Sequence, residues 1–397
     1  MLPKGWTQSP LREGVRIHSG HAPSDLNLLT EGEIPYVKVE DLNNCEKYQT
    51  DSREYLSACR SVVPAQALIF PKRGAAIFAN KIRIAARPLA LDTNLMGVEV
   101  VSGLDPEYLY YAISFAGLHR LADTSTIPQL NNKHVLPHVL PRPSLKEQRR
   151  IAQILSTWDQ AIAASEGLVT NAQRQMECML QQVLIKPAAR GDWDKRSIGE
   201  LSERIQRRAN EGEELPVLMI SSGSGFVRQD EKYSRFMAGK SVENYIALER
   251  GEFAYNKGNS KSYEFGCVFP LNAYRRGLVP NVYVCFKLSP NLNAVFYEHL
   301  FRADFLHDQL GALVNTGVRN NGLLNIKPVD FLACQVPVPP LDVQHRIAEV
   351  LTTSAKWIAL QERDLELLKL EKAALMSQLL TGKRRVKLPD AKAEAQT

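Results

Sequence analysis

Two stretches of the chain place apolar residues at alternating steps of four and three positions, each over about 40 residues. This spacing gathers the side chains on one face of a helix and is typical of a coiled coil. At 1.5 Å per residue each helix would be roughly 60 Å long, well beyond the average globular helix. The seam positions are Ile151, Leu155, Trp158, Ile162, Ser165, Val169, Ala172, Met176, Met179 and Val183 in the first stretch, and Ile347, Leu351, Ser354, Ile358, Gln361, Leu365, Leu368, Lys372, Leu375 and Leu379 in the second.

Two helices with matching seams in one chain most simply pack against each other, so we predict an intramolecular coiled coil. The second seam contains three polar members, and we expect Leu360, Leu367 and Leu370 to widen its apolar stripe. Pro187 is predicted to end the first helix, because proline interrupts a helix interior. Gly382 is predicted to cap the second.

The two helices begin in a repeated segment. Residues 141–155 and 337–351 are identical at eight of fifteen positions, at an offset of 196 residues. The segments before them are repeated more weakly, as Phe70-Pro-Lys-Arg-Gly74 and Tyr255-Asn-Lys-Gly258 illustrate. Short β-branched and aromatic runs broken by Gly, Pro and Asn indicate strands and turns there.

The predicted organisation is therefore one domain and one long helix, made twice. The fold class is α/β, with two α/β domains separated by two long helices and a pseudo-twofold duplication. The predicted boundaries are 1–140 for the first domain, 141–188 for the central helix, 189–336 for the second domain, 337–382 for the C-terminal helix and 383–397 for a charged tail.

Composition adds little to this picture. The 397 residues carry a net charge of +6, yet residues 1–140 hold 14 basic and 14 acidic side chains, and residues 191–336 hold 18 and 17. Six cysteines without a C-x-x-C pair fit neither a disulfide framework nor a zinc site, so we expect them to be reduced and mostly buried. The chain shows no signal peptide and no apolar run long enough to span a membrane, so we expect a cytoplasmic protein.

Local charge is more informative than net charge. No acidic residue lies between Glu54 and Asp92, and only Glu264 lies between Phe253 and Tyr297. Lysine and arginine provide most of the affinity for DNA phosphates, so these matching stretches are candidate phosphate-binding surfaces. A solvated basic loop is the alternative. The candidates are Lys72, Arg73, Lys81, Arg83 and Arg87 in the first stretch, and Lys257, Asn259, Lys261, Arg275 and Arg276 in the second.

Two amide-rich clusters precede the long helices at equivalent places in the repeat. Base edges are read by side chains with paired donors and acceptors, chiefly Arg, Asn and Gln. We therefore predict that these clusters lie near DNA, with asparagine-rich turns as the alternative. The candidates are Gln129, Asn131, Asn132 and Lys133 in the first cluster and Arg319, Asn320 and Asn321 in the second.

Motifs for covalent chemistry are missing from the sequence. There is no Asn/Asp-Pro-Pro-aromatic motif of an adenine methyltransferase, no complete P-loop and no H-E-x-x-H spacing. We therefore predict a non-catalytic protein that holds no cofactor and no metal of its own.

The helix start Pro-x-Pro-x-Leu-x-x-Gln-x-Arg-Ile-Ala, present twice and each time after a strand-rich domain, resembles the specificity subunits of type I restriction–modification systems. The family's motif has an acidic residue before the glutamine; Glu147 fits and Val343 does not. The resemblance implies that the helix starts dock partner subunits, through Leu145, Gln148, Arg150 and Ile151 in the first helix and Leu341, Gln344, Arg346 and Ile347 in the second.

The resemblance also implies a function. Each domain would be a target-recognition domain that reads one half of a bipartite, asymmetric sequence in double-stranded DNA. The helices would form an antiparallel coiled coil that holds the domains apart and docks two methyltransferase subunits. Those partners would carry S-adenosylmethionine and methylate adenine N6, and restriction/motor subunits would join them. The alternative is a coiled-coil scaffold whose α/β domains bind proteins rather than DNA.

Overall fold

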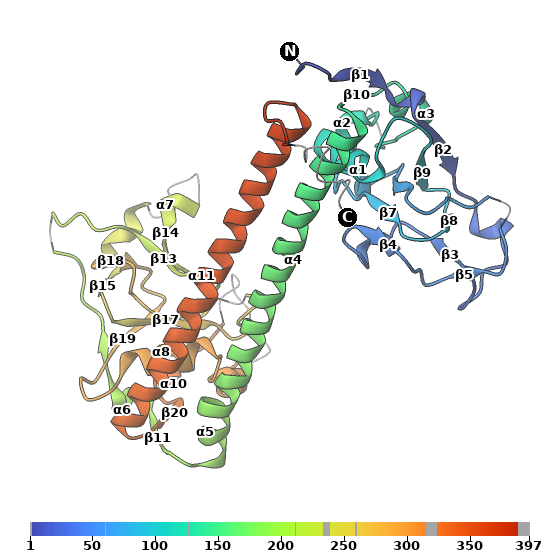
Figure 1. Ribbon diagram of the computed structural model, residues 1–397. Coiled ribbons are helices and arrows are strands. Elements are labelled where there is room, and N and C mark those ends of the chain that lie inside the picture. The colour runs from blue at the N-terminus through green and yellow to red at the C-terminus, as the bar shows by residue number, and fades with distance from the viewer. Residues whose placement is uncertain are drawn as a thin grey trace, which may run out of the picture. The chain divides into compact units, whose positions relative to one another are not determined.

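The computed structural model describes residues 2–59, 61–124, 127–210, 212–232, 239–258, 260–314 and 324–387. The chain divides into two compact units. Unit 1 combines Met1–Glu166 with Arg363–Thr397, and unit 2 is Gly167–Glu362. Each unit contains a strand-rich domain and one half of each of two long helices, α4 (Leu145–Leu180) and α11 (Leu341–Leu380), which are green and red in Figure 1.

The domain of unit 1 is built on a five-stranded sheet in the order β2-β9-β6-β7-β4. All its pairs are antiparallel except β4 with β7. Helix α1 (Pro106–Ala116) buries Tyr108 in the same core as Phe70 of the sheet. The strands are β2 (Val15–Ser19), β4 (Tyr48–Gln49), β6 (Leu68–Pro71), β7 (Arg83–Ala85) and β9 (Leu95–Val100), and a smaller sheet holds β3 (Ile34–Val37), β5 (Tyr55–Leu56) and β8 (Ala90–Leu91).

The domain of unit 2 repeats four of these strands in the order β12-β19-β16-β17, again all antiparallel. Strands β6 and β16 therefore occupy the same place, which confirms the weak sequence match between Phe70 and Tyr255. Two further antiparallel strand pairs complete the domain. The strands are β12 (Ser202–Ile205), β16 (Phe253–Asn256), β17 (Cys267–Pro270) and β19 (Val284–Leu288), with the pairs β13 (Leu218–Ser221) and β14 (Gly225–Arg228), and β15 (Ile246–Glu249) and β18 (Arg276–Val279).

Short helices fill the remaining connections. Unit 1 contains α2 (Leu118–Leu121) and α3 (Asn132–Val135), and unit 2 contains α6 (Ile198–Leu201), α7 (Gln229–Lys232), α8 (Ala294–Arg302), α9 (His307–Leu313) and α10 (Pro328–Leu332).

A two-stranded ribbon carries each domain into its long helix. In unit 1, β1 (Thr7–Pro10) pairs with β10 (Val139–Arg142), which leads into α4. In unit 2, β11 (Asp194–Ser197) pairs with β20 (Gln335–Val338), which leads into α11. Residues 141–142 and 337–338, predicted as the first residues of the helices, are thus strand. The prolines that follow them separate strand from helix, because proline has a fixed φ and no N–H for a helix interior.

The long helices run antiparallel within each unit. In unit 1, Lys372 forms an ion pair with Asp159, and Lys369 Nζ lies 3.0 Å from Glu166 Oε1. In unit 2, Gln173 Nε2 donates to Glu362 Oε1 at 2.9 Å, and Ser354 Oγ lies 3.8 Å from Met179 Sδ. As residue numbers rise along α4, those of its partners on α11 fall, which confirms the coiled-coil prediction.

All twenty predicted seam positions are buried or half-buried. The expectation for Leu360, Leu367 and Leu370 is wrong, since they are 58%, 48% and 65% exposed. The polar seam positions stay inward, and Lys372 does so because its ammonium reaches Asp159 across the helix pair. Leu360 and Leu367 each lie one residue from a seam position, and a step of one residue turns the side chain about 100° around a helix.

The predicted end of the first helix is also wrong. After α4 the chain continues through a π-helical segment, Gln181–Ile185, and then α5 (Lys186–Arg190). Pro187 lies in the first turn of α5, a position that tolerates proline. Gly191, with φ of +80°, ends this helix. Gly382 ends α11 as predicted, with φ of +75° and its N–H directed to Leu379 O at 3.3 Å.

Among the described residues, no helix is long and apolar enough to cross a membrane. All six cysteines are free. Cys267, Cys285 and Cys334 are buried, Cys45 and Cys59 are half-buried, and Cys178 is exposed, so only half of them are as buried as the sequence analysis expected.

Candidate nucleic-acid interface

The candidate site of unit 1 lies where β6 ends. After Pro71 the chain leaves the sheet, with Lys72 half-buried and Arg73 exposed. The Lys72 N–H donates to Asn94 O at 2.8 Å, which fixes the backbone at the start of this loop. A rigid strand therefore presents two neighbouring cations at its end.

The structure brings the amide-rich cluster of unit 1 to these cations. Leu130 N donates to Lys72 O at 2.9 Å, Gly74 N donates to Pro128 O at 3.0 Å, and Arg73 and Gln129 form an antiparallel bridge. Two segments that the sequence analysis identified separately are thus one surface. Asn131, Asn132 and Lys133 follow directly and are exposed around the start of α3.

The same backbone contact occurs in unit 2. Lys257 follows β16 as Lys72 follows β6, and Leu324 N donates to Lys257 O at 3.1 Å. Leu324 is the first described residue after the second amide-rich cluster. Asn259, Arg319, Asn320 and Asn321 lie outside the described residues. The repeated hydrogen bond gives Lys72 and Lys257 equivalent places in the two domains.

The electrostatics of Lys72 fit an anion-binding surface. Burial, and after it the neighbouring Arg73 guanidinium, lower the pKa of Lys72, against an opposing effect of Asp92. A phosphate brought next to this pair would favour the charged ammonium and reverse the effect of Arg73.

Several other basic candidates already have partners in their own domain. The Arg83 guanidinium donates to Cys45 O, Ile82 O and Leu42 O at 2.7–2.8 Å, so it ties a loop to the sheet. Arg276 forms ion pairs with Glu213 and Glu249. Lys81 is bonded to Asn43 and Arg87 to Glu33 O. These contacts leave the four side chains less available to DNA, whereas Lys261 and Arg275 are exposed.

Two apolar residues beside the unit 1 surface were missed by the sequence analysis. Phe78 is 58% exposed and follows the Arg73–Gly74 turn, and Ile127 is 65% exposed and precedes Pro128. Exposed apolar side chains can contact a thymine methyl group. The sequence carries no signal for this, because Phe and Ile in short apolar runs indicate a core.

The predicted docking residues at the helix starts separate into two groups. Leu145, Arg150, Leu341 and Arg346 are exposed and can meet a partner. Gln148 and Gln344 are only 1% exposed, and Ile151 is buried in the core of unit 1. Ile347 packs partly buried against the core of unit 2.

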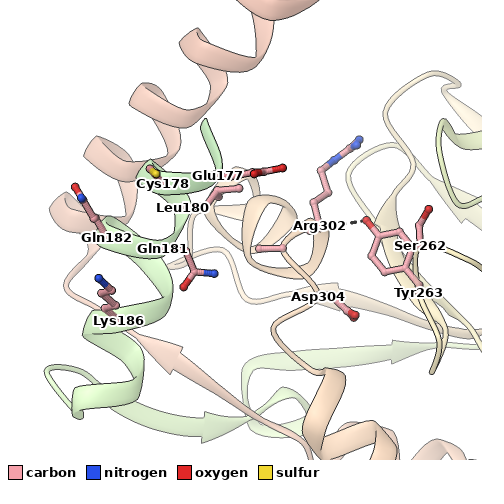
Figure 2. A pocket seen from close by; sticks show the side chains of 11 residues that line it. Glu177, Cys178, Leu180, Gln181, Gln182, Lys186, Ser262, Tyr263, Arg302 and Asp304 are labelled. Atoms are coloured by element: carbon pink, nitrogen blue, oxygen red, sulfur yellow. Dashed lines mark hydrogen bonds between the residues drawn. The ribbon is translucent and has the colours of Figure 1, made fainter. Parts of the chain in front are cut away.

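A hollow of about 820 Å³ opens elsewhere in unit 2 (Figure 2). Glu177, Gln181 and Lys186 line one side, on α4, the π-helical segment and α5, and Tyr263 and Arg302 line the other. The Tyr263 hydroxyl donates to Arg302 O at 3.1 Å, and the Arg302 guanidinium pairs with Glu298. Among the predicted DNA-binding residues that the structure describes, none lines this hollow.

Comparison with known proteins gives a consistent result. Residues 3–171 match the family described as "Type I restriction modification DNA specificity domain". The MjaIX specificity subunit of a type I restriction enzyme from Methanocaldococcus jannaschii is 22% identical, over 97% of this chain and 95% of its own. The MjaVIII specificity subunit of the same organism is 23% identical, over 72% and 71%.

Solved structures support the same fold. The S subunit of a type I restriction–modification system from M. genitalium superposes with a TM-score of 0.56 at 13% identity, covering 94% of this chain and 96% of that one. A chain from a structure concerned with complex assembly and conformational transition of the type I R-M system gives 0.57 at 16% identity, covering 97% and 100%. The N-terminal part of the chain therefore matches the type I specificity-domain family, and the chain as a whole shares the fold of these solved structures.

Proposed function

We propose that this chain reads a bipartite, asymmetric sequence in double-stranded DNA, with one target-recognition domain for each half. The observation that carries the proposal is the repeated contact between Leu130 and Lys72 and between Leu324 and Lys257. It gives two domains with different loops the same cation at the same place. A shared phosphate contact would position each domain on DNA, while the different loops would read different bases.

The proposal assigns the long helices two tasks. As an antiparallel pair they would fix the spacing between the two half-sites, because a rigid helix converts length into distance. They would also dock two adenine-N6 methyltransferase subunits, which bring S-adenosylmethionine, and restriction/motor subunits would join for cleavage. The chain itself would hold no cofactor and do no covalent chemistry, and the complex would act in the cytoplasm.

Exposed apolar positions on α11 support the docking task. In the unit 2 half of the helix, Val350, Trp357 and Leu360 are 45–58% exposed, and in the unit 1 half Leu367 and Leu370 are 48% and 65% exposed. Around the helix, the three positions in unit 2 lie within about 80° of one another and the two in unit 1 within about 60°, so each half has an exposed apolar face away from the seam. Such a face is suited to a helical partner.

A domain exchange tests the reading function. Residues 189–336 would be replaced by the corresponding domain of a related specificity subunit, and the chain would be expressed with its methyltransferase subunit in a host without other methylation. Sequencing of methylated adenines should show one half-site changed and the other retained. If both half-sites stay the same, sequence reading does not reside in this domain. The rival protein-binding scaffold predicts no dependence of methylation on this exchange and little salt dependence of duplex affinity.

A further inference from the structure

Docking of a partner subunit does not explain the glutamine at the start of each long helix. Gln148 and Gln344 are each 1% exposed, although they follow exposed Leu145 and Leu341 by three residues. Burying a polar amide is unfavourable unless it is hydrogen-bonded. The partners of these two amides therefore indicate what the glutamines do.

In unit 1, Gln148 joins α4 to the first domain. Its Oε1 accepts a hydrogen bond from the Asp105 N–H at 2.8 Å, and Asp105 is the N-cap of α1. Its Nε2 donates to Gly103 O at 3.2 Å and to Pro143 O at 2.9 Å. One side chain thus holds the helix, the domain and the proline turn between them.

In unit 2, Gln344 makes the same connection. Its Oε1 accepts from the Asn293 N–H at 2.9 Å, and Asn293 is the N-cap of α8. Its Nε2 donates to Pro339 O at 2.8 Å. The N-cap positions are 188 residues apart, whereas the glutamines are 196 apart, so the repeat is of geometry rather than of uniform sequence spacing.

A tyrosine reinforces each junction. The Tyr108 hydroxyl donates to Pro141 O at 2.8 Å, and the Tyr297 hydroxyl donates to Pro337 O at 3.2 Å. Both tyrosines lie on the domain helices, α1 and α8, and both prolines lie in the strands that lead into the long helices. Each domain is therefore held to its long helix by directional hydrogen bonds as well as by apolar packing.

The angle at such a junction matters for a split DNA target. For a domain of this size, a tilt of about 10° at the helix start displaces a point about 20 Å away by about 3.5 Å. That displacement is close to the rise of one base pair, about 3.4 Å. A loose junction would let one domain reach half-sites one base pair closer or farther.

We infer that Gln148 and Gln344 are positioning residues that fix the angle of each recognition domain on its long helix and thereby restrict the spacing of the two half-sites. This inference rests on the proposed function. It assigns to the two helix starts a role inside the chain, separate from any contact with partner subunits.

The test uses the complete chain with its methyltransferase subunit and the variants Gln148→Met and Gln344→Met, which keep the side-chain volume but remove the hydrogen bonds. Methylation is measured on duplexes that carry the native half-sites with the native spacer, or with one base pair more or fewer. We expect the preference for the native spacer to fall about tenfold in each variant, with unchanged half-sites. Gln49→Met is the matched control, since Gln49 is a 2% exposed amide on β4 that accepts from Cys45 Sγ at 3.0 Å within its own domain, away from the helix start.

A second pair of variants separates positioning from general destabilisation. Gln148→Glu and Gln344→Glu place a carboxylate oxygen against carbonyl oxygens, which disfavours the ionised form and raises the pKa of the new carboxyl. Spacer preference should be lost at pH 8.5 and recover in part towards pH 6, where the single O–H of the protonated carboxyl can replace one hydrogen bond of the amide. This pH dependence also tests the inference if the Met variants do not assemble with the methyltransferase subunit.

Retention of the full spacer preference in folded Met variants, or a preference in the Glu variants that does not change with pH, would overturn the inference. Failure of the proposed function looks different, because the unaltered chain would then show no spacer preference at all.

Discussion

The two units share their strands and the junction with the long helix, but they differ in the contacts around the residue before the buried glutamine. Both contain the same four antiparallel strands, the same ribbon into a long helix and the same buried glutamine at the helix start. In unit 1 the residue before the glutamine is Glu147, whose side chain is 4% exposed. Arg385 donates to it at 2.6 and 2.9 Å, and Trp6 Nε1 donates to it at 3.1 Å.

This difference explains why Val343 departs from the acidic residue of the motif. Arg385 belongs to the segment that follows α11, and that segment packs on the N-terminal residues of unit 1, where Arg385 Nη1 also donates to Lys4 O at 3.1 Å. In unit 2, the tryptophan at the corresponding place, Trp193, instead meets Phe296 edge to face, with ring centroids 6.4 Å apart. A buried acidic residue is stable only where a cation pairs with it. The second copy of the motif can therefore carry Val343 where the first carries Glu147.

The largest effect is expected at this unequal position. Glu147→Ala should lower the free energy of unfolding by about 2 kcal/mol, because it leaves the Trp6 indole N–H and the Arg385 guanidinium without their acceptor. The loss is limited to this size because Arg385 is half exposed and water can solvate its charge. Urea unfolding followed by tryptophan fluorescence measures the change. Val343→Ala is the comparison in unit 2 and should cost less than about 1 kcal/mol. Equal losses would show that the buried acid contributes nothing beyond packing.

An intermediate effect should appear at the equivalent cations. Lys72→Met and Lys257→Met should each weaken duplex affinity of the assembled complex about threefold to tenfold and reduce the salt dependence by about one phosphate contact, a slope of about 0.9. Titrations at several salt concentrations measure both quantities. Arg174→Met removes one exposed charge from α4 and should leave the slope unchanged. A loss in only one of the two lysine variants would contradict the equivalence of the two domains.

The smallest effect concerns pH and should be shared by both units. His299 in unit 2 is buried, its Nε2 lies 3.0 Å from Thr352 Oγ1, and burial lowers its pKa; burial also lowers the pKa of His138 in unit 1. The unfolded chain therefore binds protons at higher pH than the folded chain, and stability is lost as pH falls below the ordinary histidine pKa of about 6.5.

Thermal unfolding of His299→Gln between pH 7.5 and 5.5 tests this expectation. The variant should lose less stability on acidification than the unaltered chain, with a difference of less than about 1 kcal/mol. Some loss should remain in the variant, because His138 is still present. A variant with the same pH dependence as the unaltered chain would show that His299 takes no part.

The long helices were the most predictable part of the molecule. Heptad spacing identified every seam position, including polar Lys372, because facing inward depends on the helical period rather than on the residue type. The errors came from positions whose environment depends on contacts with other segments rather than on the helical period. Leu360 and Leu370 are apolar but face away from the seam, and Pro187 begins a short helix after a π-helical segment instead of ending the long one.

The candidate interface was predicted only in pieces. Charge and amide content selected Lys72, Arg73 and Gln129, but nothing in the sequence joins residues 56 positions apart. The same reasoning selected Arg83 and Arg276, whose charges are engaged by carbonyls and carboxylates of their own domain. Composition counts charges, whereas the fold decides which of them face solvent.

The sequence by itself determined the duplication, the helix seams and the family resemblance, because these depend on periodicity and on a motif that recurs along the chain. Only the tertiary structure decided which residues of distant segments meet. It placed Lys72 beside Leu130 and Lys257 beside Leu324, and it turned Gln148 and Gln344 inward onto the N-caps of the domain helices. The physical reason is that hydrogen bonds between distant segments depend on strand order and helix docking, which local sequence patterns do not encode.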